Sequence, residues 1–583
     1  MNVYPLYDGG VLRFDAVLEA CFKESLDTEQ RAAASKLAKT LLETDTPIKQ
    51  LENYLSELGI GAQCAVVEGE YLDKNFSDDY TAYYGGCFRE CPRKCCRIHF
   101  FKEAYEQKTI ERLLVTSHKD PALDEFKQSY LGFVVIRPLR HTIVGRTCLV
   151  PYKSAPKAQD KGRHYPAVCK NEVSFFGIKL SVECMPFQEQ DCGTSACATC
   201  ALWSAFSVSA KMFGNKCLSP SAITTIATEN NFSVGTRFPN RGLTTEEMVY
   251  VVRENGLEPI FARLKNCDIS ELEYLFPGFV YAYLNLGVSV IAVIEDIAGG
   301  GKHAIAINGY NLKADNGEGL SAKRIDKFYA NDDQCCPGAR YCLRWDKKAL
   351  IIDAYHNSSH NPKLHKSYTL EYLMVPIYHK IRVTFNEVAQ LMFEANGILL
   401  YTDLFCSPLH NEFLKKLYKK DEIRAITSNI VAQVEAWERN HSTNLDWGNG
   451  DEITKGFLKN LLKKYDKYCS QHKGEQFKKI QWDVTIRASN DVKEEIRSDV
   501  RIPERSRVEI LEQALPHYVW CIRISYGKKD SAIILIDATD SVRGVFVVGV
   551  FFYDTELQVI ARNAYANTKE IVANPVLKAL CAY

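Results

Sequence analysis

The sequence has no excess of charge of either sign. Lysine and arginine together number 72, as do aspartate and glutamate, so the formal net charge is zero. Proteins that bind nucleic acids use a surplus of basic residues to neutralise the phosphates. We therefore predict no nucleic-acid partner for this chain.

Long hydrophobic runs are also missing. One of the most apolar stretches, residues 544–553, is about ten residues long, whereas a membrane-spanning helix needs roughly twenty. The segment Met1–Asp15 lacks a basic region followed by an apolar run, which does not match a signal peptide. We expect a cytoplasmic protein without a membrane partner.

The sequence has no nucleotide-binding motif, no internal repeat and no low-complexity segment, so we predict no cofactor. The sequence contains 21 cysteines among 583 residues, which is about 3.6%. This fraction is well below the roughly 8–10% cysteine of small proteins held together by disulfides. In a cytoplasmic chain of this size, reduced and mostly buried thiols are the expected state.

The length and the mixed helix and strand patterns predict three domains of α/β or α+β class. We expect an N-terminal α/β accessory domain over residues 1–170, a central domain over 171–382 and a C-terminal α+β accessory domain over 383–583. In the central domain, Ser270–Leu284 is helical in pattern, and Pro277 should break or kink it. In the C-terminal domain, the pattern of apolar and basic residues over 451–469 predicts a basic amphipathic helix.

A basic stretch of the N-terminal domain concentrates possible zinc ligands. Cys87, Cys91, Cys95 and His99 lie within thirteen residues, together with Cys96. Thiolates and imidazoles bind zinc, but zinc sites usually combine two closely spaced ligand pairs that are far apart in sequence. The simpler interpretation is a connection into a strand with some buried thiols, and no metal is our main expectation.

Three cysteines of the central domain lie in one short stretch. Residues 186–209 have the pattern of a loop, a turn and a helix, with Thr194 and Ser195 as possible N-caps. A cysteine in the first turn faces the positive end of the helix, which stabilises a thiolate nucleophile. Cys192 and Cys197 are the two candidates for this nucleophile, whereas Cys200 lies a full turn into the helix and is expected in the core.

A histidine and an acid follow at the ends of two predicted strands. His303 comes after three glycines and begins the strand Ala304–Asn308, where a flexible turn lets a substrate approach. Asp332 follows the short strand Phe328–Ala330 and is the preferred third group that orients the imidazole, with Asn331 as the alternative. A simple turn is the competing interpretation of this polar segment.

These segments resemble the papain-like cysteine peptidase superfamily. Residues 191–203 (DCGTSACATCALW), 301–310 (GKHAIAINGY) and 329–334 (YANDDQ) are similar to bacterial papain-like proteins if Cys197 is the nucleophile. With Cys192 as the nucleophile, the same stretch resembles the bacteriocin-processing double-glycine peptidases. The resemblance covers roughly residues 130–380 and implies a central papain-like hydrolase domain with a Cys–His–Asp triad.

The resemblance also implies a glutamine that helps to bind an oxyanion shortly before the nucleophile. Gln190 lies seven residues before Cys197, and Gln188 lies four residues before Cys192. This spacing favours Gln190 with Cys197 and leaves Gln188 with Cys192 as the alternative.

The sequence thus predicts a multidomain cysteine peptidase or amidase that cleaves a peptide or isopeptide bond. Two alternatives stay open: an inactive papain-like module that binds a peptide, and acyl transfer of the transglutaminase or deamidase type by the same triad. The expected partner is a peptide or protein substrate, and the pattern does not identify it or the oligomeric state.

Overall fold

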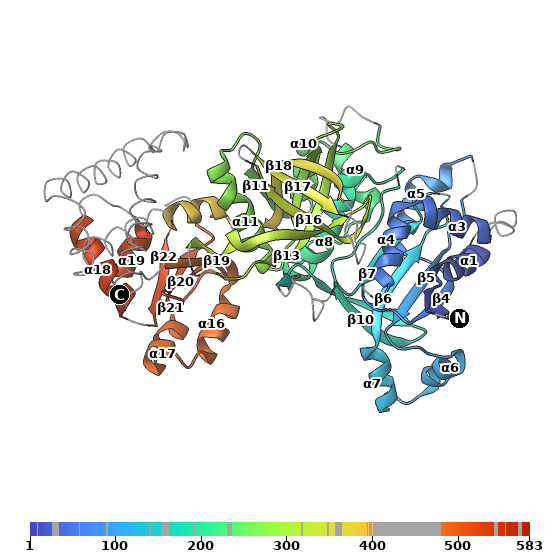
Figure 1. Cartoon of the computed structure of the whole chain (residues 1–583), viewed down its shortest axis with the longest axis horizontal. Coiled ribbons are helices and arrows are strands. Elements are labelled where there is room, and N and C mark those ends of the chain that lie inside the picture. Colours follow the sequence, from blue (N-terminus) through green and yellow to red (C-terminus); the bar gives the residue numbers. More distant parts are fainter. Residues whose placement is uncertain are drawn as a thin grey trace. The chain divides into compact units, whose positions relative to one another are not determined.

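The computed structural model describes residues 1–392, 395, 399 and 480–582, except for residues 9, 26–33, 58, 89–90, 140, 153–161, 192, 230–235, 316, 318, 347–348, 356–363, 541–545, 554 and 569–573. The fold is mixed α+β, as predicted (Figure 1). The chain divides into two compact units, residues 1–313 with 324–379 and residues 314–323 with 380–583. The boundary predicted at residue 170 falls inside the first unit, and the helix predicted over 451–469 lies outside the described residues.

The first unit begins with an antiparallel five-stranded sheet. Its order is β1 (Asn2–Pro5), β4 (Cys64–Tyr71), β5 (Cys95–Phe101), β6 (Tyr130–Ile136) and β7 (Val144–Leu149). Helices α1 (Phe14–Ser25), α3 (Ala34–Thr44) and α4 (Thr46–Leu55) pack on one face. The other face carries α5 (Lys74–Ala82), α6 (Gln107–Val115), α7 (Pro121–Gln128) and the hairpin of β9 (Cys169–Phe175) and β10 (Ile178–Cys184). All residues of β5 and β6 are buried because both faces of the sheet are covered.

The second sheet of this unit carries the candidate site. Its order is β11 (Leu257–Arg263), β18 (Leu364–Tyr378), β12 (Val290–Asp296), β13 (Lys302–Leu312), β15 (Ile325–Asp332), β16 (Cys336–Trp345) and β17 (Leu350–Tyr355), and β8 (Arg163–His164) also pairs with β13. An additional pairing of β17 with β18 closes six of these strands into a ring. Closure protects the strand edges that would otherwise be left unpaired.

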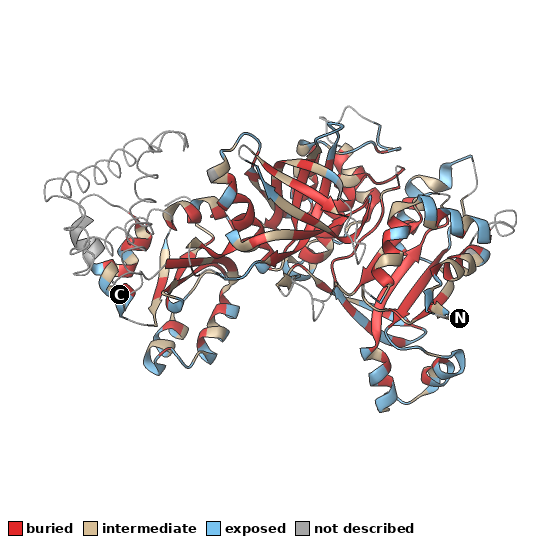
Figure 2. Ribbon diagram, in the orientation of Figure 1, coloured by how far each residue is buried: buried red, intermediate tan, exposed pale blue. Residues whose placement is uncertain are grey.

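Helix α8 (Cys197–Phe213) packs against this second sheet. Leu202 and Phe206 are fully buried in a core cluster shared with Ile291 of β12, Ala304 of β13 and Met374 of β18. Figure 2 shows the strands of the sheet and α8 as largely buried. The cluster fixes the start of α8 relative to β13, and those two ends carry the predicted cysteine and histidine.

Three further helices belong to the same region: α9 (Pro220–Thr228), α10 (Thr245–Glu254) and α11 (Ile269–Asn285). The predicted helix is confirmed as α11, and of the break or kink expected at Pro277 the break is absent, because α11 is continuous through this residue. Phe276, Phe279, Val280 and Tyr283 are buried around this proline. Tertiary packing stabilises the helix beyond its local propensity, which compensates for the missing backbone hydrogen bond.

The second unit is another α+β structure. Its sheet has the order β14 (Gly319–Leu320), β19 (Ile480–Ala488), β20 (Tyr518–Tyr526), β21 (Lys529–Asp537) and β22 (Val547–Phe552). Its helices are α16 (Ser489–Ser498), α17 (Glu504–Glu512), α18 (Glu556–Thr568) and α19 (Pro575–Ala582). None of the helices in the described part of either unit has the length and apolar character needed to cross a bilayer.

Candidate active site

The predicted nucleophile Cys197 is the first residue of α8. The preceding Ala196 is the N-cap and makes no side-chain cap hydrogen bond, so the predicted caps Thr194 and Ser195 are wrong. The first intrahelical bond runs from the Cys200 amide to the Ala196 carbonyl. The amides of the first turn have no intrahelical partner, which makes this end of the helix suited to negative charge.

Thr194 and Ser195 instead help to close a turn around Asp191. The Asp191 Oδ1 accepts hydrogen bonds from the amides of Gly193, Thr194 and Ser195 at 2.8–3.0 Å, and its Oδ2 accepts the Thr194 hydroxyl at 2.6 Å. Buried Arg137 lies 3.9 Å from Asp191 Oδ2. Burial raises the pKa of Asp191, but Arg137 and these hydrogen bonds outweigh burial and lower it. Asp191 thus remains charged and fixes the loop before Cys197.

His303 and Asp332 form the best-defined pair of the site. His303 is the second residue of β13, Asp332 is the last residue of β15, and the two strands are neighbours in the sheet. The His303 Nε2 lies 2.8 Å from Asp332 Oδ1, and both side chains are buried. The structure therefore joins two residues that are 29 positions apart in the sequence.

The environment of His303 favours its protonated form. Burial lowers the pKa of His303, but the charge and hydrogen bond of Asp332 and a hydrogen-bonding contribution from Cys197 together raise it well above the usual value. Because Nε2 faces Asp332, Nδ1 is the ring nitrogen left for the thiol. Nδ1 forms no aligned hydrogen bond.

Asp332 is held by more than the imidazole. The Tyr341 hydroxyl donates to Asp332 Oδ2 at 2.7 Å, and the Gln334 amide donates to Oδ1 at 3.0 Å. Burial raises the pKa of Asp332, whereas His303, Tyr341 and the Gln334 amide lower it below the usual value. Sequence reasoning missed Tyr341, because its strand lies a hairpin away and only strand pairing brings it here.

Asp333 is a second acid that the sequence did not single out. It is 3% exposed, and neither carboxylate oxygen has a hydrogen-bond partner. Its Oδ1 lies 3.7 Å from His303 Nε2. Burial raises the pKa of Asp333 to about 7, with His303 lowering it and Asp332 raising it. The doubled acid in the sequence was the available signal.

The alternative third group, Asn331, has different partners. Its amide donates to the carbonyls of Met185 and Pro186 at 3.3 and 2.9 Å, and its Oδ1 accepts the Gly338 amide at 3.2 Å. Asn331 therefore ties β15 to the loop before α8, while the adjacent Asp332 contacts His303.

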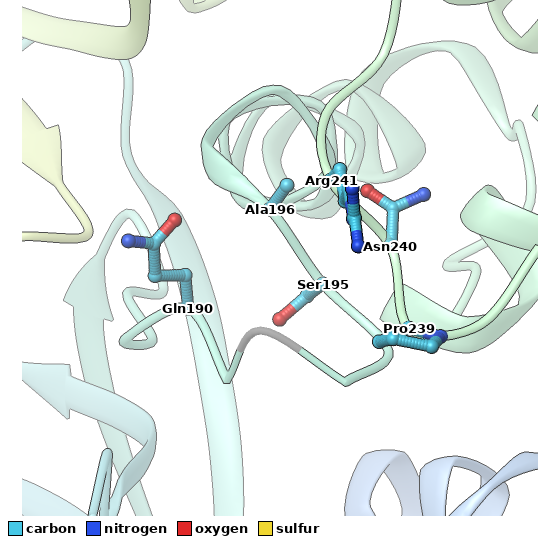
Figure 3. A pocket seen from close by; sticks show the side chains of 6 residues that line it. All are labelled: Gln190, Ser195, Ala196, Pro239, Asn240 and Arg241. Carbon is cyan, nitrogen blue, oxygen red and sulfur yellow. The ribbon is translucent and has the colours of Figure 1, made fainter. Parts of the chain in front are cut away.

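A pocket of about 400 Å³ lies beside the start of α8 (Figure 3). Its lining consists of Gln190, Ser195, Ala196, Pro239, Asn240 and Arg241. In Figure 3, Gln190 lies on one side of the pocket, and Asn240 and Arg241 lie on the other. The alternative glutamine, Gln188, is buried at 3% exposure and its amide nitrogen has no hydrogen-bond partner.

The central stretch contains two other cysteines, Cys192 and Cys200. Cys200 is buried, and burial raises its pKa well above the usual value, so it is a core thiol as predicted. The alternative nucleophile Cys192 lies outside the described residues.

The candidate zinc ligands of the first sheet are not brought together. Cys87 is exposed, Cys91 is half-buried and Cys95 is buried. The ring nitrogens of buried His99 face the Tyr130 hydroxyl at 3.0 Å and Glu68 Oε2 at 3.3 Å. Within the described ranges, the group of three or more potential ligands that does come together is His303, Asp332 and Asp333.

No family model matches this chain, and no curated protein matches it significantly.

Proposed function

We propose that this protein is a papain-like cysteine hydrolase that cleaves a peptide or isopeptide bond with Cys197, His303 and Asp332. The observation that carries the proposal is the buried hydrogen bond of 2.8 Å between His303 Nε2 and Asp332, at a site where Cys197 also raises the pKa of His303. A cysteine at the start of a helix, paired with an oriented imidazole, is a recurrent way to activate a thiol.

The chemistry follows from the two sides of the imidazole. Asp332 accepts a hydrogen bond from Nε2–H of the neutral imidazole, which leaves the Nδ1 lone pair to take the proton of the Cys197 thiol and form the imidazolium. The thiolate attacks a carbonyl carbon, and the imidazolium then gives its Nδ1 proton to the leaving amine. A water molecule, deprotonated by the same nitrogen, hydrolyses the thioester and restores the thiol.

The pocket at the start of α8 gives a place for the oxyanion and part of the substrate. Gln190 lines this pocket together with Ala196, the residue before Cys197. We assign the Gln190 side-chain amide and a backbone amide of the first turn of α8 as the donors to the oxyanion. Removing one such donor typically lowers the rate by about 10²–10³-fold.

Selective alkylation tests the proposal. The full chain is exposed to limiting iodoacetamide at neutral pH, and each of its 21 cysteines is followed by mass spectrometry. Cys197 should react fastest, and His303→Ala should slow it by tenfold or more. Cys200→Ala, which changes a buried thiol in the same helix, is the matched control and should leave the rate unchanged.

Peptide mixtures separate hydrolysis from its alternatives. Cleavage by the wild type and not by Cys197→Ala supports the hydrolase. Incorporation of an added amine without cleavage would support acyl transfer. Peptide binding without any fast-reacting cysteine would support an inactive binding module, and fastest labelling at Cys192 would move the nucleophile to that residue.

A further inference from the structure

The carboxylate of Asp333 is a buried and poorly compensated group beside His303. It is 3% exposed, lacks a hydrogen bond on either oxygen and follows the charged Asp332 directly. Buried polar groups in folded proteins nearly always have partners, and a buried charge is costly unless another charge offsets it. Asp333 lies 3.7 Å from His303 Nε2, so whatever offsets its charge also acts on the histidine.

Three possible metal ligands converge at this point. One ligand atom from each of His303, Asp332 and Asp333 lies within 4.8 Å of the others, and all three residues are buried. The set combines one imidazole nitrogen with two carboxylates. A divalent cation would neutralise both carboxylates in a region that is largely buried. Nitrogen and oxygen donors of this kind suit divalent first-row transition metals such as zinc and manganese.

We propose that His303, Asp332 and Asp333 form a binding site for a divalent first-row transition-metal ion, and that this ion reversibly switches off Cys197. A metal ion on Nε2 uses the lone pair of that nitrogen, so the single ring proton must reside on Nδ1. Nδ1 then cannot accept the thiol proton. The binding part stands independently, whereas the switching part rests on the proposed function.

The position of the ion distinguishes this site from a Cys–His metal chelate. The acids face Nε2, whereas the thiol has only Nδ1 left to it. Binding should therefore require Asp333 and be independent of Cys197. A chelate between the thiol and the imidazole would show the opposite dependence.

Manganese is the suitable probe for binding, because carboxylates accept Mn²⁺ readily and the many thiols of this chain prefer softer ions. The full-length protein is stripped with a chelator, and Mn²⁺ is titrated while free Mn²⁺ is measured by electron paramagnetic resonance. One strong equivalent is expected in the wild type and in Cys197→Ala. Affinity should fall at least about tenfold in Asp333→Asn, because even outer-shell partners of a metal typically matter by 10–100-fold.

Asp353→Asn is the matched control, because Asp353 is another buried acid of the same sheet and pairs with Arg344. It should bind Mn²⁺ like the wild type. Equal affinity in Asp333→Asn, or loss of binding in Cys197→Ala, would overturn the metal site. If Asp333→Asn does not fold, the wild type still decides: Mn²⁺ must raise its melting temperature, and an unchanged melting temperature would overturn the site.

Alkylation of Cys197 tests the switch. Saturating Mn²⁺ should slow labelling of Cys197 at least tenfold in the wild type and leave Asp333→Asn unaffected. Metal binding without slower labelling would overturn the switch and keep the site. If Cys197 shows no enhanced reactivity in metal-free protein, the proposed hydrolase and its switch both fail, while the Mn²⁺ titration still decides the metal site.

Discussion

The two nitrogens of His303 face different chemical groups, and this difference organises the candidate site. Nε2 is fixed at 2.8 Å from Asp332, whose other oxygen accepts the Tyr341 hydroxyl. Every member of this chain of hydrogen bonds is buried. Bonds in such surroundings are stronger than in water and costly to break one at a time.

Replacing the charge of Asp332 while keeping its shape should reveal its role. In Asp332→Asn the amide oxygen can still accept from His303, but the negative charge that stabilises the imidazolium is lost. Loss of this charge should lower the pKa of His303, and each pKa unit is worth about 1.4 kcal/mol. We therefore expect alkylation of Cys197 at neutral pH to slow by about tenfold or more. Asp353→Asn should leave that rate unchanged. An unaltered rate in Asp332→Asn would show that Asp332 does not act on His303.

Glu189 is another buried acid, and its raised pKa predicts how the free energy of unfolding depends on pH. Burial, with a smaller contribution from Asp45, raises the pKa of Glu189 from 4.5 to about 8, although Arg137 opposes the shift. The native state therefore binds more protons than the unfolded state between about pH 4.5 and 8. The contribution of this carboxyl to stability is full below pH 4.5 and is lost as the pH rises toward 8.

In Glu189→Gln this loss should be absent. The amide oxygen can replace Oε2 as acceptor of the Val144 amide hydrogen bond. Between pH 5 and 8, the free energy of unfolding of the wild type should fall relative to the variant by up to ~1.4 kcal/mol per pH unit. Urea unfolding at each pH measures this difference. A difference between the wild type and Glu189→Gln that stays constant over this range would contradict the raised pKa of Glu189.

At the scale of elements, three adjacent residues at the end of β15 make different contacts. Asn331 binds the loop before α8, Asp332 binds His303, and Asp333 lies beyond the last strand residue and still reaches His303. Alternation along a strand sends Asn331 and Asp332 to opposite sides. The end of the strand then allows Asp333 to depart from that alternation.

Asn331→Ala should therefore weaken the fold more than the chemistry. The variant removes the hydrogen bonds from the Asn331 amide to the Met185 and Pro186 carbonyls and the acceptor of the Gly338 amide, although the Ser204 hydroxyl still donates to Pro186. This loss should cost roughly 2–3 kcal/mol in the free energy of unfolding. Asn311→Ala, which removes one side-chain bond to Asp326, should cost about 1 kcal/mol. If Asn331→Ala instead kept its stability and slowed Cys197 labelling as Asp332→Asn does, Asn331 would be the third group.

At the scale of the whole molecule, the second unit is assembled from two separate pieces of chain. Residues 314–323 leave the first unit, and their strand β14 pairs in parallel with β19. The excursion begins and ends at adjacent points, because the Lys313 amide donates to the Arg324 carbonyl at 2.8 Å. The first unit can therefore be closed without this excursion.

A shortened chain tests this organisation. Residues 1–379 with 314–323 replaced by Asn-Gly should join β13 to β15 by a two-residue hairpin turn. We expect cooperative unfolding and labelling of Cys197 within about threefold of the full chain. The same fragment with residues 314–323 retained exposes the apolar Leu320 and Ala322 and should associate more, as measured by light scattering. Failure of the closed fragment to unfold cooperatively would contradict the division into two units.

The sequence by itself determined the fold class, the helix that begins near Cys197 and the two strands that carry His303 and Asp332. These are local properties, set by hydrophobic period and by turn residues. The sequence also ranked Asp332 above Asn331 for contact with the histidine, and the hydrogen bond of 2.8 Å agrees with that order.

Tertiary structure alone decided what surrounds the pair. Asp333 and Tyr341 reach the site, and Arg137 lies beside Asp191, through contacts between residues far apart in the chain. Helix α11 continues through Pro277 because of the packing around it. Local propensity does not predict such contacts. Strand pairing and burial set both the distance between groups and the charge that each group bears.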